Sequence, residues 1–308
     1  RWSEAWKDEP ASGSPYMPIP LGPAMKEEFP DVLEYVRVAE GWGDEFTRAN
    51  NMVVPIPVMY ADASIFKVFS FKAKEGNLST ALDDPRHVVL SASAAKKLFG
   101  NEDPMGKKVE VKVDKNFEPF MVSAVSEDPP SNSTIAFQVV VNFRAYLNTD
   151  WGKKSENEWH RSGFITYVQL QPGSHLPNDQ TKFDNLYKEK YPEETANLKE
   201  SGWKGPGLPS SYKLMPIRDM HTNIKVAGSA VGTVDPKNIW ILLGIAASIL
   251  IIACINFMNL ATARSERRAR EVGIRKTVGS VRWQLIGQFI GESLLIALLA
   301  FVVAIVFV

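Results

Sequence analysis

The last 70 residues of the chain contain two long apolar runs with a short polar segment between them. Residues 239–261 form a run of 23 residues without a charged side chain, and residues 284–308 form a second run whose only charge is Glu292. As a helix at about 1.5 Å per residue, the first run spans roughly 34 Å, which exceeds a hydrocarbon core of about 30 Å. Buried core helices are seldom apolar on every side for this length. We therefore expect two transmembrane helices, at 239–261 and 284–308.

The polar segment 262–283 determines the orientation that we expect for these helices. It carries all seven basic residues found beyond residue 238, namely Arg264, Arg267, Arg268, Arg270, Arg275, Lys276 and Arg282. Short loops rich in Lys and Arg stay on the cytoplasmic side of a membrane. This pattern places residues 1–238 outside the cytoplasm. Trp240 and Trp283 then fall near the outer and inner interfaces, where such rings prefer to lie.

Part of this cytoplasmic segment has the pattern of two helices joined at a glycine. Residues 271–279 read EVGIRKTVG, which predicts a short helix that ends at Gly279 in a left-handed conformation. Ser280 is then a plausible N-cap for the second membrane helix. A helix–Gly–helix joint is more than a topological loop requires. We interpret it as a docking element for a cytoplasmic partner.

The second membrane helix carries small and polar residues that favour helix packing. Gly287 and Gly291 are four residues apart and offer a face for close helix approach, and Gly244 and Ser248 do the same more weakly in the first helix. Glu292 lies about two turns beyond Trp283. Glu292 can extend to the interface, hydrogen-bond a neighbouring helix or relay protons, and a packing or capping role is favoured among these.

Residues 1–235 read as an α+β extracytoplasmic domain made of short strands and helices. Val109, Val111 and Val113 alternate with charged residues, as in a half-buried strand. Further strands are expected at 120–125, 136–141 and 164–170. Helices are expected at 92–99, closed by Gly100, and around 183–190.

Composition and motifs exclude several classes of protein. The 308 residues include 35 basic and 35 acidic side chains and one cysteine, Cys254. The balance argues against a uniformly basic nucleic-acid binder, and the lone thiol excludes a disulfide-stapled domain. The four histidines are scattered, a phosphate-binding G-x-x-x-x-G-K-[ST] loop is absent, and Gly41-Trp-Gly43 lacks a third glycine. We predict no enzyme activity, catalytic residue, metal or cofactor.

Several stretches together resemble the FtsX/MacB-type permease subunits of ABC transporters, in the form found in Bacteroidetes. The tail ACINFMNLATARSERRAREVGIRKTVGSVRWQLIGQFIGESLL resembles the second helix, coupling segment and third helix of that family. The stretch YADASIFKVFSFKAKEGNLSTALDDPRHVVLSASAAKKLFGNEDPMGKKVEV resembles its MacB-like periplasmic core domain. LGPAMKEEFPDVLEYVRV and VSAVSEDPPSNSTIAF fit the same domain.

The resemblance implies an organisation and a function. It implies a periplasmic core domain at 1–235 and an FtsX-like membrane domain fragment at 236–308, within a longer inner-membrane permease. A separate ABC ATPase would dock on the coupling segment, through Glu271, Gly273, Ile274, Arg275, Lys276 and Gly279. A second permease copy or half, the lipid bilayer and a periplasmic protein are the other expected partners. ATP hydrolysis would then drive export, lipoprotein release or signalling. The alternative is a membrane-anchored extracytoplasmic sensor or binding protein without ATPase coupling.

Overall fold

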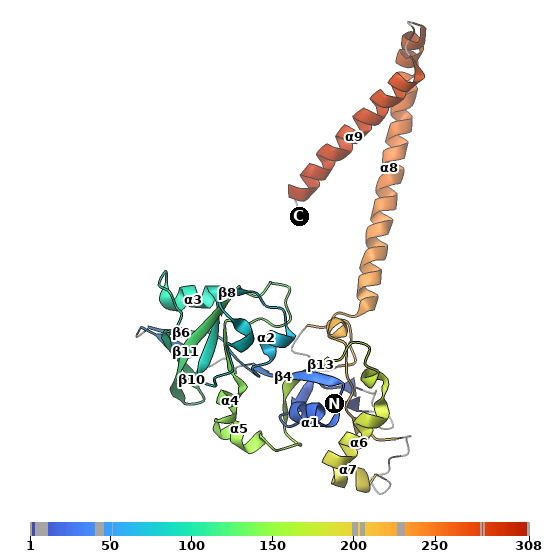
Figure 1. The fold of residues 1–308 in the computed structure, drawn as a ribbon. Coiled ribbons are helices and arrows are strands. Elements are labelled where there is room, and N and C mark those ends of the chain that lie inside the picture. The colour runs from blue at the N-terminus through green and yellow to red at the C-terminus, as the bar shows by residue number, and fades with distance from the viewer. Residues whose placement is uncertain are drawn as a thin grey trace. The chain divides into compact units, whose positions relative to one another are not determined.

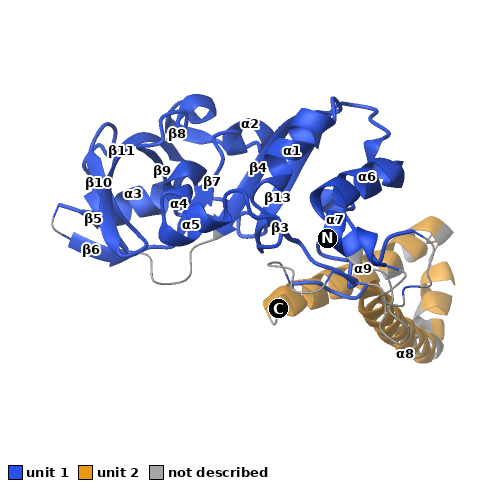
Figure 2. Cartoon of the chain, turned by 90° about the horizontal axis from the view of Figure 1, so that it is seen from below, with its two compact units in different colours: residues 1–235 blue, residues 236–308 orange. Residues whose placement is uncertain are grey.

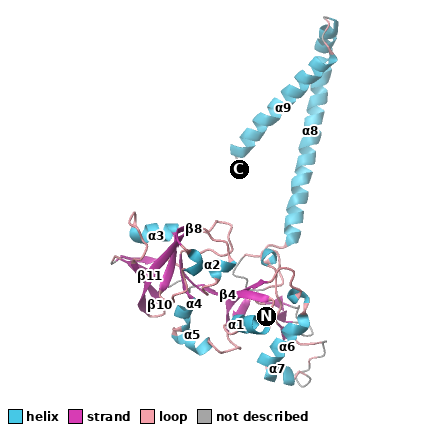
Figure 3. Cartoon of the chain, in the orientation of Figure 1, coloured by secondary structure: helices cyan, strands magenta, loops and turns pink. Residues whose placement is uncertain are grey.

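The structure is a computed structural model that describes residues 2–3, 12–40, 46–50, 52–198, 203, 207–226, 232–277, 279 and 281–306. The chain divides into two compact units, residues 1–235 and residues 236–308 (Figure 2). The first unit contains all the strands that the structure describes, together with seven α-helices. The second unit consists of two long helices (Figure 3).

The first unit is built on one large mixed sheet (Figure 1). Its strands pair in the order β3-β13-β4-β7-β12-β9-β11-β10-β5-β6, and β8 pairs with β11. The strands of this sheet are β3 (Tyr16–Pro18), β4 (Val32–Glu40), β5 (Phe46–Ala49), β6 (Met52–Pro55), β7 (Val58–Ala61), β8 (Ala73–Gly76), β9 (His87–Ser91), β10 (Lys108–Val113), β11 (Asn116–Ser126), β12 (Val139–Asn142) and β13 (Ser162–Leu170). A small second sheet joins β14 (Ser210–Ser211), β1 (Trp2–Ser3) and β2 (Ser12–Gly13).

The helices of the first unit are short. They are α1 (Leu21–Glu28), α2 (Ile65–Val68), α3 (Ala92–Phe99), α4 (Phe143–Leu147), α5 (Asp150–Ser155), α6 (Gln180–Lys190) and α7 (Pro192–Ala196). Three 3₁₀ turns accompany them, η1 (Leu78–Thr80), η2 (Leu176–Asn178) and η3 (Ile217–Asp219). The predicted α+β class is confirmed.

The middle of the large sheet is buried on both faces. In β12, Val139 and Val141 join the core cluster that contains α3 and α4, and Val140 joins the cluster that contains α2. Successive side chains of a strand point to opposite faces, so a strand covered on both sides reads as a continuous apolar run. A third cluster lies under α1 and α6 and includes Phe29 and Phe183, whose rings meet edge to face.

Local sequence signals located several elements accurately. The alternation at Val109, Val111 and Val113 became β10, with all three side chains buried. Helix α3 spans the predicted 92–99, and Gly100 ends it with a φ of +63°. The expected strands at 120–125, 136–141 and 164–170 overlap β11, β12 and β13.

The second unit departs from the expected pattern in one respect. Helix α8 (Pro236–Thr277) is one continuous helix of 42 residues, so the first membrane helix does not end at residue 261. The segment after residue 261 is rich in Ala, Arg and Glu, which are strong helix formers, and it contains no proline. Helix α9 (Arg282–Val306) follows. Among the described residues, the helical portions long and apolar enough to cross a membrane are Pro236–Ala263 and Ile286–Val306.

Candidate functional site

The predicted coupling segment forms the last turns of α8. Gly273, Ile274, Arg275 and Lys276 lie in this helix, beyond the apolar portion that ends at Ala263. At about 1.5 Å per residue, the 14 residues from 264 to 277 extend the helix by roughly 21 Å. The backbone of Glu271 is helical here, and its side chain lies outside the described part. Ile274 is 64% exposed, which presents a large apolar side chain on this extension.

A glycine turn ends α8, as the sequence predicted. Gly279 has a φ of +96°, and its N–H donates to the carbonyl of Lys276 at 3.2 Å. A Cβ at Gly279 would meet nothing within 4 Å. The backbone angle, rather than lack of space, therefore requires glycine here. The predicted N-cap, Ser280, lies outside the described residues.

A hydrogen bond across this turn links the coupling segment to α9. Nη1 of Arg275 donates to Oε1 of Gln288 at 2.7 Å. The contact joins the end of α8 to the second turn of α9. Sequence reasoning did not single out Gln288; its only signal is an amide close to the start of an apolar helix.

The two packing glycines of α9 lie on an open face. A Cβ at Gly287 or at Gly291 would meet no atom within 4 Å, so the structure does not bring them against another described segment. Gly244 of α8 is equally open. These faces remain predictions for helix packing.

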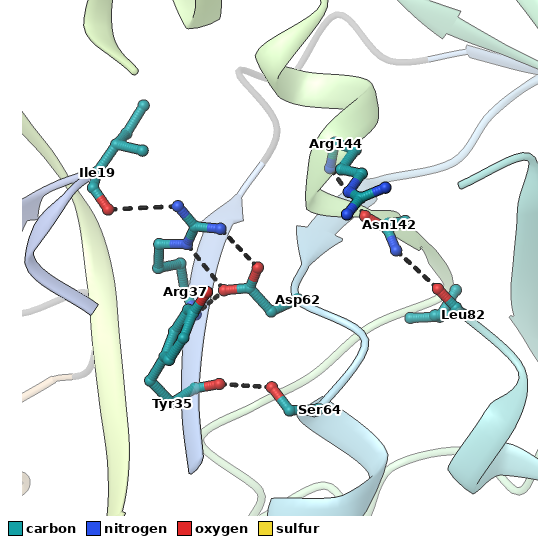
Figure 4. Close-up of polar contacts among 8 residues, drawn as sticks. All are labelled: Ile19, Tyr35, Arg37, Asp62, Ser64, Leu82, Asn142 and Arg144. Carbon is teal, nitrogen blue, oxygen red and sulfur yellow. Dashed lines mark hydrogen bonds and ion pairs between the residues drawn. The ribbon is translucent and has the colours of Figure 1, made fainter. Parts of the chain in front are cut away.

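Among the described residues of the first unit, a polar cluster is centred on Arg37 that was not identified from the sequence (Figure 4). The Nε and Nη2 atoms of Arg37 donate to the two carboxylate oxygens of Asp62 at 2.8 and 2.7 Å. The backbone N–H of Arg37 donates to the same carboxylate at 2.8 Å, and Nη1 donates to the carbonyl of Ile19 at 3.3 Å. The guanidinium also lies over the ring of Phe143, 4.4 Å from its centroid.

This cluster links two strands of the large sheet to one of the helices that cover it. Arg37 lies in β4, Asp62 follows β7, and Phe143 begins α4. Ser64, just beyond Asp62, donates to the carbonyl of Tyr35 (Figure 4). The ion pair is enclosed, since the side chains of Arg37 and Asp62 are only 10% and 15% exposed. Its hydrogen-bonding groups are paired, so we assign it a structural role.

The described histidines His160 and His221 make ordinary polar contacts, and the paired aspartates that the sequence offered lie in a turn. No group of three or more His, Cys, Asp or Glu side chains in that part of the chain could hold a metal ion. His160 faces Glu194 at 3.4 Å, and His221 contacts Thr134. Asp83 and Asp84 lie in an exposed turn. Gly41 to Gly43 fall outside the described residues.

Comparison with known proteins assigns both parts of the chain. The MacB-like periplasmic core domain matches residues 3–186, which is more than half of the chain, and the FtsX-like permease C-terminal domain matches residues 243–308. The chain belongs to the FtsX/MacB family of ABC transporter permeases. Membership and the two apolar helices together point to a membrane protein with a periplasmic domain.

The individual proteins that resemble this chain share about a quarter to a third of its residues over the aligned regions. The uncharacterized ABC transporter permease YknZ of Bacillus subtilis is 31% identical over 99 residues, covering 32% of this chain and 23% of that protein. The macrolide export ATP-binding/permease protein MacB of Aggregatibacter actinomycetemcomitans is 26% identical over 242 residues, covering 76% of this chain and 32% of that protein. The chain thus spans about a third or less of these relatives. A solved domain of a putative permease from Porphyromonas gingivalis has 23% identity and a TM-score of 0.49, covering 57% of this chain and 78% of that one.

Proposed function

We propose that the chain transmits movement from a cytoplasmic ABC ATPase to its periplasmic domain, to drive export, lipoprotein release or signalling. In this proposal ATP is hydrolysed on a separate partner subunit, and the chain itself is not an enzyme. The protein resides in the inner membrane, with residues 1–238 on the periplasmic side.

The observation that carries this proposal is the continuity of α8. The helix begins directly after Asp235, the last residue of the first unit, and runs for 42 residues to Thr277. At about 1.5 Å per residue it is roughly 63 Å long. Sharp kinks in helices arise mainly at proline and at related defects, and the only proline of α8 is its first residue, Pro236. A displacement at the cytoplasmic end can therefore travel the length of α8 without crossing a proline kink, and the periplasmic domain adjoins the start of this helix in the chain.

The partner's contact surface is proposed from the exposed end of the same helix. Ile274 supplies an apolar anchor and Lys276 a neighbouring positive charge. A partner groove with an apolar floor and an acidic rim would match this pair. Gly279 sets the angle at which α9 leaves the contact.

A second permease copy or half is the proposed neighbour within the membrane. Gly287 and Gly291 present backbone without side chains along one face of α9, and such faces allow helices to approach closely in lipid. A partner on the periplasmic side is expected to receive the transmitted movement.

The test is purification of the intact protein from its native membrane. We expect an ATPase with a phosphate-binding loop to co-purify. Ile274→Asp should abolish this association, because it places a charge in an apolar contact. Val53→Asp is the matched control, since Val53 is also exposed, at 49%, but belongs to the first unit. If no ATPase accompanies the wild-type chain, the membrane-anchored sensor becomes the better explanation.

A further inference from the structure

Exposed apolar side chains gather where the first unit ends. Among its described residues, eight large hydrophobic side chains are exposed: Leu33, Met52, Val53, Met121, Trp151, Ile217, Ile224 and Val234. Three of the eight fall within the last 19 residues of the unit. Ile217, Ile224 and Val234 are 53%, 54% and 49% exposed. Single exposed hydrophobic residues are ordinary, but a group of three beside a membrane helix requires an explanation.

The segment that carries the two isoleucines is fixed to the body of the unit. Met220, which lies between them, is only 8% exposed. The N–H of Gly13 donates to the carbonyl of Lys225 at 2.8 Å, and Gly13 forms a parallel bridge with Val226. Nε2 of His221 and Oγ1 of Thr134 are 2.8 Å apart. Ile217 and Ile224 are therefore held in place while their side chains stay exposed.

The same segment must lie close to the membrane surface. The N–H of Val234 donates to the carbonyl of His221 at 2.8 Å, which places residue 234 beside the middle of segment 217–226. Two residues after Val234, α8 begins, and the uncharged run starts at Ile239. Two extended and three helical residues cover at most about 12 Å, so Val234 lies at the level of the lipid headgroups. This follows from chain connectivity alone.

Basic side chains accompany the apolar ones. The side chain of Arg218 is 85% exposed and lies 3.7 Å from the half-exposed carboxylate of Asp219, and Lys225 is also exposed. Apolar side chains flanked by Lys or Arg are typical of segments that lie in the membrane interface, where the cations approach lipid phosphates.

We propose that Ile217, Arg218, Ile224, Lys225 and Val234 form a juxtamembrane patch that binds the lipid surface facing the periplasmic domain. The three apolar side chains enter the headgroup layer, and the two cations contact phosphates. Because His221 and Gly13 tie the patch to the rest of the unit, lipid contact supports the domain at a second point besides α8. The proposal depends on membrane insertion of α8 and not on an ATPase partner.

The test uses the full chain reconstituted in phosphatidylcholine/phosphatidylglycerol vesicles. Cys254→Ser removes the native thiol, and Thr222→Cys carries a fluorophore two residues before Ile224. Nitroxide groups on the lipid headgroups quench a fluorophore only at short range. We expect strong quenching at position 222. A fluorophore at Val53→Cys should be quenched little, because β6 lies at the opposite end of the strand order from β3, and Gly13, to which the patch is tied, comes three residues before β3.

Two double variants separate lipid binding from mere tethering. Ile217→Ser with Ile224→Ser should lower the quenching at position 222, whereas Met52→Ser with Val53→Ser should leave it unchanged. All four positions are about half exposed, so neither pair is expected to unfold the domain. Equal quenching at positions 222 and 53 would overturn the proposal. So would quenching at 222 that survives loss of both isoleucines. The comparison of positions 222 and 53 needs no patch variant, so equal quenching can overturn the proposal even if a patch variant misfolds.

Discussion

Asp62→Ala should destabilise the periplasmic domain severely, because it leaves the guanidinium of Arg37 buried without its counter-ion. The substitution removes both side-chain hydrogen bonds and the acceptor of the Arg37 backbone N–H. Only the carbonyl of Ile19 would remain, at 3.3 Å from Nη1. Arg37 cannot escape the charge by deprotonation, since arginine keeps its proton under all ordinary conditions.

The magnitude follows from the burial of the pair. Breaking a buried ion pair by removing one partner costs about 3–5 kcal/mol, against a total stability of roughly 5–15 kcal/mol for a domain. Arg86 and Glu118 provide a matched control, because Nη1 of Arg86 lies 2.6 Å from Glu118 but the Arg86 side chain is 58% exposed. Glu118→Ala should cost about 1 kcal/mol or less. Both ion pairs are close, so the difference in unfolding free energy between the two variants reports the effect of burial.

Urea denaturation of residues 1–235, followed by circular dichroism, measures both variants. We expect this segment to fold alone, because its three core clusters, as far as the structure describes them, are built from residues of the first unit. Replacing both members of the buried pair, with Arg37→Met and Asp62→Leu, should recover part of the loss, since no unpaired charge remains. Equal destabilisation by Asp62→Ala and Glu118→Ala would refute the reasoning.

Three further predictions concern the joint, the core and the topology. Arg275→Glu should lower the rate at which the bound ATPase hydrolyses ATP. Adding Gln288→Arg should restore this rate, because it rebuilds the contact between the two positions with reversed polarity. Absence of rescue would mean that Arg275 acts on the partner directly. Burial raises the pKa of Tyr146 to about 12, so the folded state loses stability as the pH rises from about 10 to about 12. Tyr146→Phe should reduce this loss of stability at alkaline pH, measured by urea denaturation. It should not destabilise the domain at pH 7, because the buried hydroxyl has no partner among the described residues. An equal loss of stability between about pH 10 and about pH 12 in the variant would contradict this prediction. A cysteine at Ser265 should react with impermeant thiol reagents only from the cytoplasmic side, and labelling from outside would invert the orientation.

Elements with strong local signals were predictable from the sequence. The alternating valines of β10 and the helix that ends at Gly100 depend on side-chain period and on one glycine, both of which are local properties. The turn at Gly279 was predictable for the same reason. The strand β12 was placed less well, at 136–141 instead of 139–142, because a strand buried on both faces has no alternation to mark its ends.

Contacts between distant residues could not be predicted in the same way. Arg37 and Asp62 are 25 residues apart, and their pairing depends on β4 lying beside β7 in the sheet. Arg275 and Gln288 meet only because the turn at Gly279 directs α9 back toward α8. The continuity of α8 was missed because the change from apolar to basic residues at 262 marks the end of the membrane portion and not the end of the helix.

The central claim, that α8 carries movement from the coupling segment to the periplasmic domain, is tested most directly by breaking the helix between them. Ala263→Pro introduces a kink where the apolar portion ends, at a cost of about 3 kcal/mol to the helix, and Ala263→Ser is its control. The measurement is the distance between spin labels at Met52→Cys in two copies that also carry Cys254→Ser, in lipid nanodiscs with the ATPase bound, before and after ATP is added.

We predict that ATP changes this distance in the wild-type and Ala263→Ser chains. In the Ala263→Pro chain the ATPase should remain bound and the distance should not respond. An equal response in the Ala263→Pro chain, or no response in the wild type, would contradict transmission through α8.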